Sequence, residues 1–283
     1  MKYMIVLLAL AVTVLGWVDE NGRDSSIPDG TLPQGSDAIV LSVLDTFQVP
    51  SAGQMLGLDT QEGCAQLVVL DSNAELLRAV AMGTGNPVWT CPTPRTFTFG
   101  CCHNWPVPYG WYVNCFVDTE MYYYDSSSWS VAFTNPAGSY GRGMDFQNDG
   151  NYIWETYSSS STHGIYRIDE TGAYNYYSVP EVPGQMSGLT IFPYNSNLGI
   201  FVTCYNFQEW FLYEFNGSSL TYKGSGSVGL SNFTESRGLT YHADTDTFFW
   251  SYVVYSTIQW IAEVQFTETA LEQSTWGSIK ANF

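Results

Sequence analysis

The sequence predicts an all-β protein, a five-bladed β-propeller with about four antiparallel strands in each blade. Two observations support this fold class. Apolar residues alternate with polar ones in short runs and do not recur at the helical spacing of three and four. A glycine followed by Leu or Met also opens four of these runs, at Gly57, Gly143, Gly188 and Gly238. The intervals between these glycines are 86, 45 and 50 residues, which indicates a repeat.

The first interval is nearly twice the others, so we expect one further copy of the repeat near residue 98. The segment RTFTFG (residues 95–100) lies there, and the alignment places Thr96 at the glycine position. Five copies with a period near 45 residues follow, each long enough for four strands. A small sheet has two apolar faces, and a ring of such sheets buries both. Six blades are the alternative count.

Strand-turn-strand segments recur at a second phase of the repeat. They lie at residues 68–77, 122–131, 166–174 and 213–222. Asp or Asn begins each turn, because its side chain accepts backbone N–H bonds there. Only a short segment separates Gly57 from Leu67. We therefore expect the first blade to be short, and either to lack a strand or to be distorted.

The N-terminal strand is predicted to close the ring. Residues 37–50 end in Val-Pro shortly before the run at Gly57, and residues 172–180 end in Val-Pro shortly before the run at Gly188. The second segment is the outer strand of a blade. The first must then be an outer strand without a blade of its own. The last repeat, which ends near residue 266, lacks an outer strand, and we expect the N-terminal strand to complete it.

The chain begins with Lys2 and a thirteen-residue apolar run, which is typical of a signal peptide with cleavage after Gly16. We expect four parts: a signal peptide (1–16), an N-terminal extension (17–36), the propeller (37–267) and a C-terminal tail (268–283). An uncleaved N-terminal anchor is the alternative. The signal peptide predicts a secreted or cell-surface protein.

An oxidising compartment favours disulfides among the six cysteines. Four of them lie between residues 91 and 115, and we expect Cys101 and Cys115 to face each other across a hairpin. Cys64 and Cys204 are interpreted as buried apolar side chains. No CxxC spacing and no nearby His pair suggests a metal site, so neither a metal nor a cofactor is predicted.

The formal net charge is −18, with only nine Lys and Arg residues. Such a surface repels nucleic acid and anionic membranes, which excludes both as partners once the signal peptide is removed. The sequence contains no P-loop and no HExxH motif. These observations favour a protein without a dedicated catalytic apparatus.

Three of the arginines occupy equivalent positions in this alignment. Arg95, Arg142 and Arg237 each stand just before the glycine position, where the innermost strand of a propeller begins. Guanidinium groups converging at the channel mouth would bind a carboxylate, a sulfate or an acidic sugar. The alternative is structural, with each arginine paired to an Asp or a loop carbonyl of the neighbouring blade.

Small polar residues stand two positions beyond the glycine: Asp59, Thr98, Asp145, Thr190 and Thr240. Alternation along the strand directs them to the same side as the glycine. A hydrogen-bonded ring that joins the inner strands is the favoured interpretation, and a site for water or a cation is the alternative. Asp59 and Asp145 are also the two acids that a glycosidase of this fold would use.

Aromatic side chains offer a second binding site in the loop HNWPVPYGW (residues 103–111). Trp105, Tyr109 and Trp111 are predicted to stack on sugar rings if they are exposed at the loop tip.

The GLTY run at Gly238, the YRIDETG turn (residues 166–172) and the segment TWGSIK (residues 275–280) resemble those of secreted bacterial β-propeller proteins from poorly characterised phyla. This resemblance implies fold and export, and it implies no reaction. We predict a secreted, non-catalytic propeller that binds an extracellular ligand, such as a glycan or an acidic group, at the channel mouth. A structural or self-assembling surface or matrix protein is one alternative, and a glycosidase or lyase is another.

Overall fold

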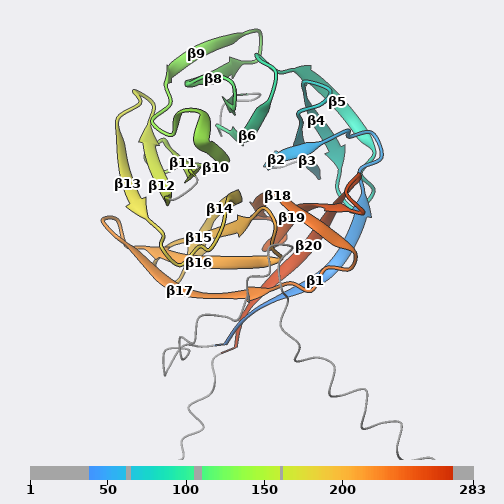
Figure 1. The fold of residues 1–283 in the computed structure, drawn as a ribbon, viewed down its shortest axis with the longest axis vertical. Coiled ribbons are helices and arrows are strands. Elements are labelled where there is room, and N and C mark those ends of the chain that lie inside the picture. The colour runs from blue at the N-terminus through green and yellow to red at the C-terminus, as the bar shows by residue number, and fades with distance from the viewer. Residues whose placement is uncertain (1–37, 62–64, 105–109, 160–161, 270–283) are drawn as a thin grey trace, which may run out of the picture. The chain divides into compact units, whose positions relative to one another are not determined.

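A computed structural model describes residues 38–61, 65–104, 110–159 and 162–269. The prediction of an all-β, five-bladed propeller is confirmed: five four-stranded antiparallel sheets stand in a ring (Figure 1). The described residues hold one short helical turn, η1 (Gly138–Tyr140). No helix among them is long and apolar enough to span a membrane. The predicted signal peptide and N-terminal extension lie outside the described residues, as does all but the start of the predicted C-terminal tail.

The strands of each blade follow one another from the channel outward. Blade one contains β2 (Met55–Gln61), β3 (Gln66–Asp71), β4 (Leu76–Ala81) and β5 (Pro87–Pro92). Blade two contains β6 (Thr98–His103), β7 (Gly110–Cys115), β8 (Glu120–Asp125) and β9 (Trp129–Thr134). Blade three contains β10 (Gly141–Gln147), β11 (Tyr152–Ser158), β12 (His163–Asp169) and β13 (Tyr174–Ser178). Blade four contains β14 (Met186–Tyr194), β15 (Asn197–Cys204), β16 (Glu209–Phe215) and β17 (Leu220–Ser227). Blade five contains β18 (Phe233–His242), β19 (Thr247–Val254), β20 (Ile258–Thr269) and β1 (Ala38–Gln48).

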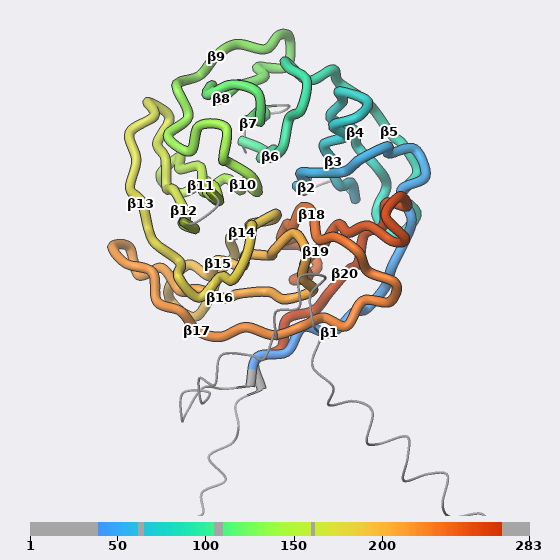
Figure 2. Tube along the Cα trace, viewed as in Figure 1, coloured from blue at the N-terminus to red at the C-terminus, as the bar shows by residue number. Residues whose placement is uncertain are grey.

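The N-terminal strand closes the ring as predicted. Strand β1 pairs antiparallel with β20 and forms the outer edge of blade five, which Figure 2 shows as blue beside red. The pairing continues into the crossover to blade one, where Val49 N donates to Gln259 O at 2.9 Å. The side chain of Gln259 then accepts from Met55 N at 3.1 Å, at the start of β2. Blade five is therefore hydrogen-bonded directly to the first strand of blade one.

Blade one is complete, contrary to the expectation of a short or distorted unit. Its four strands pair in full sequence order. The hairpin at residues 68–77 joins its second and third strands, whereas the matching segments of the other blades join the third and fourth. The hairpin between its third and fourth strands turns between Ala81 and Asn86.

The register of the inner strands corrects the alignment of blade two. In every blade the pairing of the first two strands shifts at or next to the glycine, and the residues just beyond the shift are Leu58, Cys101, Met144, Gly188 and Leu239. The glycine position of blade two is therefore Gly100, and the assignment of Thr96 was wrong. Cys101 follows this glycine, whereas Leu or Met follows the other four. Blade two therefore lacks the Gly-Leu or Gly-Met pair that identifies the other copies of the repeat.

The five glycines lie where neighbouring inner strands are closest. They are Gly57, Gly100, Gly143, Gly188 and Gly238, and an added Cβ at each would lie 3.0 Å or less from a backbone atom of the next blade's inner strand. For Gly143 that atom is Leu189 N, at 2.5 Å. For Gly238, in the last blade, it is Leu58 N of the first blade, at 2.4 Å. The glycines thus allow five inner strands to surround one axis.

The hydrophobic core is divided into clusters that each lie between two neighbouring blades. Successive residues of a strand point to opposite faces and therefore enter different clusters. Cys101 packs with blade one beside Trp111, and Cys102 packs with blade three beside Met144. Full burial of a large apolar side chain such as Met144 stabilises a blade interface by about 1.5–3 kcal/mol.

The predicted disulfide between Cys101 and Cys115 is not formed. Cys91, Cys101, Cys102, Cys115 and Cys204 are all free thiols in the described part of the chain. Cys115 pairs with Thr98, and Cys101 with Val113, because the register shift separates the two cysteines. Burial raises the pKa of the Cys101 thiol well above its usual value. Cys204 is fully buried, as expected, and Cys64 lies outside the described residues.

Replacement of Gly143 by Ala is expected to destabilise the ring by about 3 kcal/mol, since the new methyl group would overlap the backbone of β14. The matched control is Gly217→Ala in the turn between β16 and β17. Gly217 has a φ of +94° and no atom within 4 Å of the added Cβ, so that change costs about 1 kcal/mol of backbone strain. Urea unfolding of both variants measures the difference. Equal losses of stability would contradict the proposed role of Gly143.

Candidate functional site

Two pockets lie at opposite ends of the inner strands. The arginine pocket, of ≈ 390 Å³, lies at the end where these strands begin, and the aspartate pocket, of ≈ 470 Å³, lies where they finish. In β10, Arg142 lines the first and Asp145 the second. In β2, Leu56 lines the arginine pocket and Asp59 lines the aspartate pocket. All five blades contribute to each pocket, so both belong to the central channel.

The arginine pocket combines two positive charges with apolar walls. Its polar lining consists of Gln54, Ser72, Arg142, Gln185 and Arg237. Its apolar and aromatic lining consists of Leu56, Phe97, Phe99, Phe116, Met186 and Tyr205. Two of the three arginines predicted to converge at the channel mouth therefore do so.

Arg142 is held rigidly in the wall of this pocket. Its Nη1 donates to Ser139 O at 3.0 Å and to Gly141 O at 2.7 Å. The amide oxygen of Gln185 accepts from its Nε at 3.1 Å and from its Nη2 at 3.2 Å, in the orientation that satisfies both groups. The guanidinium also stacks 4.3 Å from the ring centroid of Phe99. Arg142 thus supplies a fixed positive charge with few hydrogen bonds left to make.

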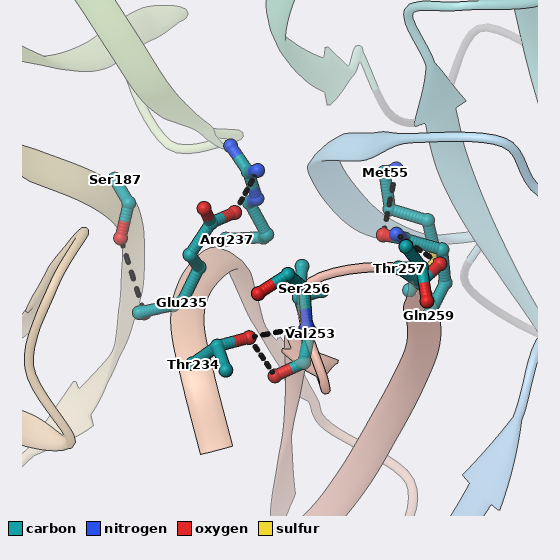
Figure 3. A network of polar contacts seen from close by, with 10 residues as sticks. Met55, Ser187, Thr234, Glu235, Arg237, Val253, Ser256, Thr257 and Gln259 are labelled. Atoms are coloured by element: carbon teal, nitrogen blue, oxygen red, sulfur yellow. Dashed lines mark hydrogen bonds and ion pairs between the residues drawn. The ribbon is translucent and has the colours of Figure 1, made fainter.

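Arg237 is less completely satisfied. Its Nη2 donates to Glu235, and Figure 3 shows the two side chains pointing toward one another. The guanidinium lies 4.6 Å from the ring centroid of Tyr205. Its Nε is buried and has no acceptor among the described residues. The Oγ of Ser72, in the same pocket, is likewise buried without a partner.

Arg95 does not join the other two arginines, which corrects the alignment. The register places Phe99, not Arg95, just before the glycine position of blade two. The Arg95 side chain is exposed, and its Nε donates to Tyr122 Oη at 2.9 Å and lies 3.4 Å from Asp118 Oδ2. Its partners belong to its own blade, and it does not line the arginine pocket.

Phe97 is a pocket residue that sequence reasoning did not identify. It adopts a left-handed backbone conformation with φ of +52°, which is costly for a bulky residue. Its ring is nevertheless 59% exposed, at the rim of the arginine pocket. Phe116, hydrogen-bonded to it through Phe116 N and Phe97 O, is 48% exposed. The rim of the arginine pocket thus combines a strained backbone with exposed aromatic surface.

The aspartate pocket contains the predicted polar ring, which joins the inner strands. Asp59 accepts from His103 N of blade two at 2.5 Å and from Thr240 Oγ1 of blade five at 3.0 Å. Asp145 accepts from Thr190 Oγ1 of blade four at 2.7 Å. Thr190 Oγ1 in turn accepts from Tyr241 N at 2.8 Å. These contacts support the interpretation that the ring holds the blades together.

The corrected register changes one member of this ring, since Cys102 and not Thr98 is the equivalent residue of blade two.

Burial, and then repulsion from the carboxylate of Asp145, raise the pKa of Asp59 well above its usual value. The Asp59 carboxyl accepts hydrogen bonds from Thr60 N, His103 N and Thr240 Oγ1.

The aromatic loop is not supported as a sugar-stacking site at Trp111. Trp111 is 1% exposed and packs in the core between blades one and two, with its ring 4.7 Å from that of His103. Its position inside β7 explains the burial. Trp105 and Tyr109 lie outside the described residues.

Glu155 is a buried acid close to the arginine pocket that the sequence did not single out as a site residue. It stands in β11 with no exposed surface, and its Oε1 accepts from the side chains of Asn114 and Asn135. Burial raises its pKa to about 7, against the opposing effects of the two amides and of Arg142. Asn114 also donates to Arg142 O at 3.0 Å, which connects the acid to the pocket wall.

No protein-family model matches the sequence, and neither does any curated protein. Solved structures are similar in fold. A chain in the crystal structure of a nidogen/laminin complex is 12% identical, with a TM-score of 0.51 over 71% of this chain and 73% of that one. Virginiamycin B lyase from Staphylococcus aureus is 13% identical, with a TM-score of 0.47 over 82% of this chain and 74% of that one. A streptogramin B lyase is 11% identical, with a TM-score of 0.46 over 81% of this chain and 98% of that one. At these identities the similarity shows the propeller fold alone.

Glu155 is expected to make stability fall as pH rises. Its ordinary pKa is 4.5, so between pH 4.5 and about 7 the native state holds a proton that the unfolded state has lost. Unfolding therefore becomes easier across this window, by ~3 kcal/mol at most. Glu155→Gln keeps an acceptor for both amides and cannot ionise, so it should be less sensitive to pH. Urea unfolding of wild type and variant at pH 5 and pH 8 measures this. Parallel pH profiles would contradict the assignment.

Proposed function

We propose that this chain is an exported propeller that binds a small anionic ligand in the arginine pocket. The single observation that carries the proposal is the convergence of Arg142 and Arg237 on one pocket lined by all five blades. The charge of −18 makes two buried guanidinium groups a local positive focus on an otherwise acidic protein. Export rests on the N-terminal apolar run and on the resemblance to secreted bacterial propeller proteins.

Binding is favoured over a purely structural role of the arginines. The structural alternative, pairing with an acid or a loop carbonyl of a neighbouring blade, is closer to Arg142, which donates to backbone carbonyls and to Gln185. It does not describe Arg237, since the one acid bonded to Arg237 is Glu235 of the same strand. The buried Nε of Arg237 and Oγ of Ser72 remain unpaired in the same pocket. Leaving buried polar groups unpaired costs about 1–3 kcal/mol each, a cost that a bound ligand would recover. The strained backbone of Phe97 at the rim also favours a binding role.

A glycosidase acting through Asp59 and Asp145 is a weaker candidate. Both carboxyl groups accept hydrogen bonds from neighbouring inner strands, which ties them to the structure of the ring. They also lie in the aspartate pocket, at the other end of the channel from the arginines. We therefore assign them to the joining of blades.

A panel of acidic and neutral glycans, with small carboxylates added, tests the proposal on the full chain. We expect anionic members to bind wild type and to lose about tenfold or more in affinity for the double variant Arg142→Gln, Arg237→Gln, because charge-assisted hydrogen bonds are lost. Arg95→Gln is the matched control, since Arg95 is exposed and outside the pocket. Binding unchanged in the double variant, with its fold intact by circular dichroism, would refute the proposal.

A further inference from the structure

The geometry of the arginine pocket points to a more specific ligand class. We infer that the pocket takes a small aromatic carboxylate in preference to a sugar acid, with Arg237 as the residue that binds the carboxylate. This inference rests on the proposed function and narrows it. Three features of the pocket support it: the unequal hydrogen bonding of the two arginines, the scarcity of unpaired polar groups, and the aromatic rim.

Arg237 has the greatest capacity to bind a carboxylate. A guanidinium carries five N–H groups, and those of Arg142 are largely committed to Ser139, Gly141 and Gln185. Arg237 is hydrogen-bonded to Glu235 and to Tyr205, and its buried Nε has no acceptor among the described residues. An added carboxylate would therefore gain new hydrogen bonds from Arg237, and from Arg142 mainly a fixed charge. Arg142 is accordingly a positioning residue.

The remaining polar groups are too few for the hydroxyls of a sugar. Besides Arg237, the polar groups left for a ligand are the buried Ser72 Oγ and the half-buried side-chain amide of Gln54. Gln185 is already engaged by Arg142. A sugar acid placed here would bury several hydroxyls with too few partners, which is costly. A ligand with one carboxylate and an apolar body leaves no such groups.

The walls favour a flat apolar body. Phe99 and Phe116 both pack against Arg142, with their ring centroids 4.3 Å and 5.1 Å from its guanidinium carbon and 6.3 Å from each other. Phe97 adds an exposed ring at the rim, and Tyr205 lies beside Arg237. Aromatic side chains stack on aromatic ligands in offset or edge-to-face geometry. A volume of ≈ 390 Å³ is suited to a small ring compound.

Glu235 provides a sharper test than loss of an arginine alone. Its carboxylate occupies Arg237 and would repel a second carboxylate nearby. Glu235→Gln should therefore bind an aromatic carboxylate several-fold more tightly than wild type. A purely structural role of the Arg237–Glu235 pair predicts no such gain.

The experiment is calorimetric titration of the full chain with 3-phenylpropionate, its neutral amide 3-phenylpropanamide, and glucuronate. We expect 3-phenylpropionate to bind about tenfold or more tightly than either of the others, because each lacks one of the two features required. Arg237→Gln should lose about tenfold or more of the affinity for 3-phenylpropionate, and Arg95→Gln should lose none. Thermal unfolding verifies that each variant is folded.

Phe97→Gly separates binding from stability at the rim. Glycine adopts a φ of +52° without strain, so this change should leave the unfolding temperature unchanged while it weakens 3-phenylpropionate binding. It should leave any binding of glucuronate unaltered.

The outcomes distinguish the two proposals. Glucuronate binding that equals or exceeds that of 3-phenylpropionate, and that is lost in Arg237→Gln, overturns the ligand class and leaves the anionic site standing. Binding of the amide as strong as that of the acid removes Arg237 from the site. An absence of binding by both anions to folded wild type overturns the proposed function together with the inference.

Discussion

The closeness of the five inner strands is the constraint on which the rest of the structure depends. Each strand passes within contact distance of the next one's backbone, and a glycine stands at each point of contact. Because the ring is closed, a methyl group added at any of these glycines would push two neighbouring inner strands apart. The interblade clusters then supply the apolar burial, but the glycines set how near the blades come.

The two pockets follow from this arrangement. Inner strands packed so closely have room at the axis for small side chains only, and larger groups are displaced toward the two strand ends. In β10, only two residues separate Arg142, which lines one pocket, from Asp145, which lines the other. The channel therefore carries positive charge at one mouth and negative charge at the opposite mouth. A ligand that enters from either side meets a chemically distinct surface.

Composition, repeat length and the Val-Pro segments were sufficient to predict the blade number, the strand count and the closure by β1. Residue-level register was not predictable in blade two, where Cys101 follows the glycine in place of Leu or Met and the predicted alignment is displaced from Gly100 to Thr96 by a shift along the strand. That one shift moved Arg95 into the predicted site and left Phe99 out of it. The place of Phe97 in the pocket rim could not be predicted from the sequence, because Phe97 is distinguished only by its left-handed backbone conformation and its exposed ring.

The pairing of β1 with β20 has a mechanical consequence. Ala38 lies opposite Thr269, so the two ends of the described ring lie side by side on one edge of blade five. Tension applied between the two chain ends would separate these strands one hydrogen-bonded pair after another, like a zipper, and would not shear all pairs at once. Such a ring is expected to open at low force when it is pulled from both ends.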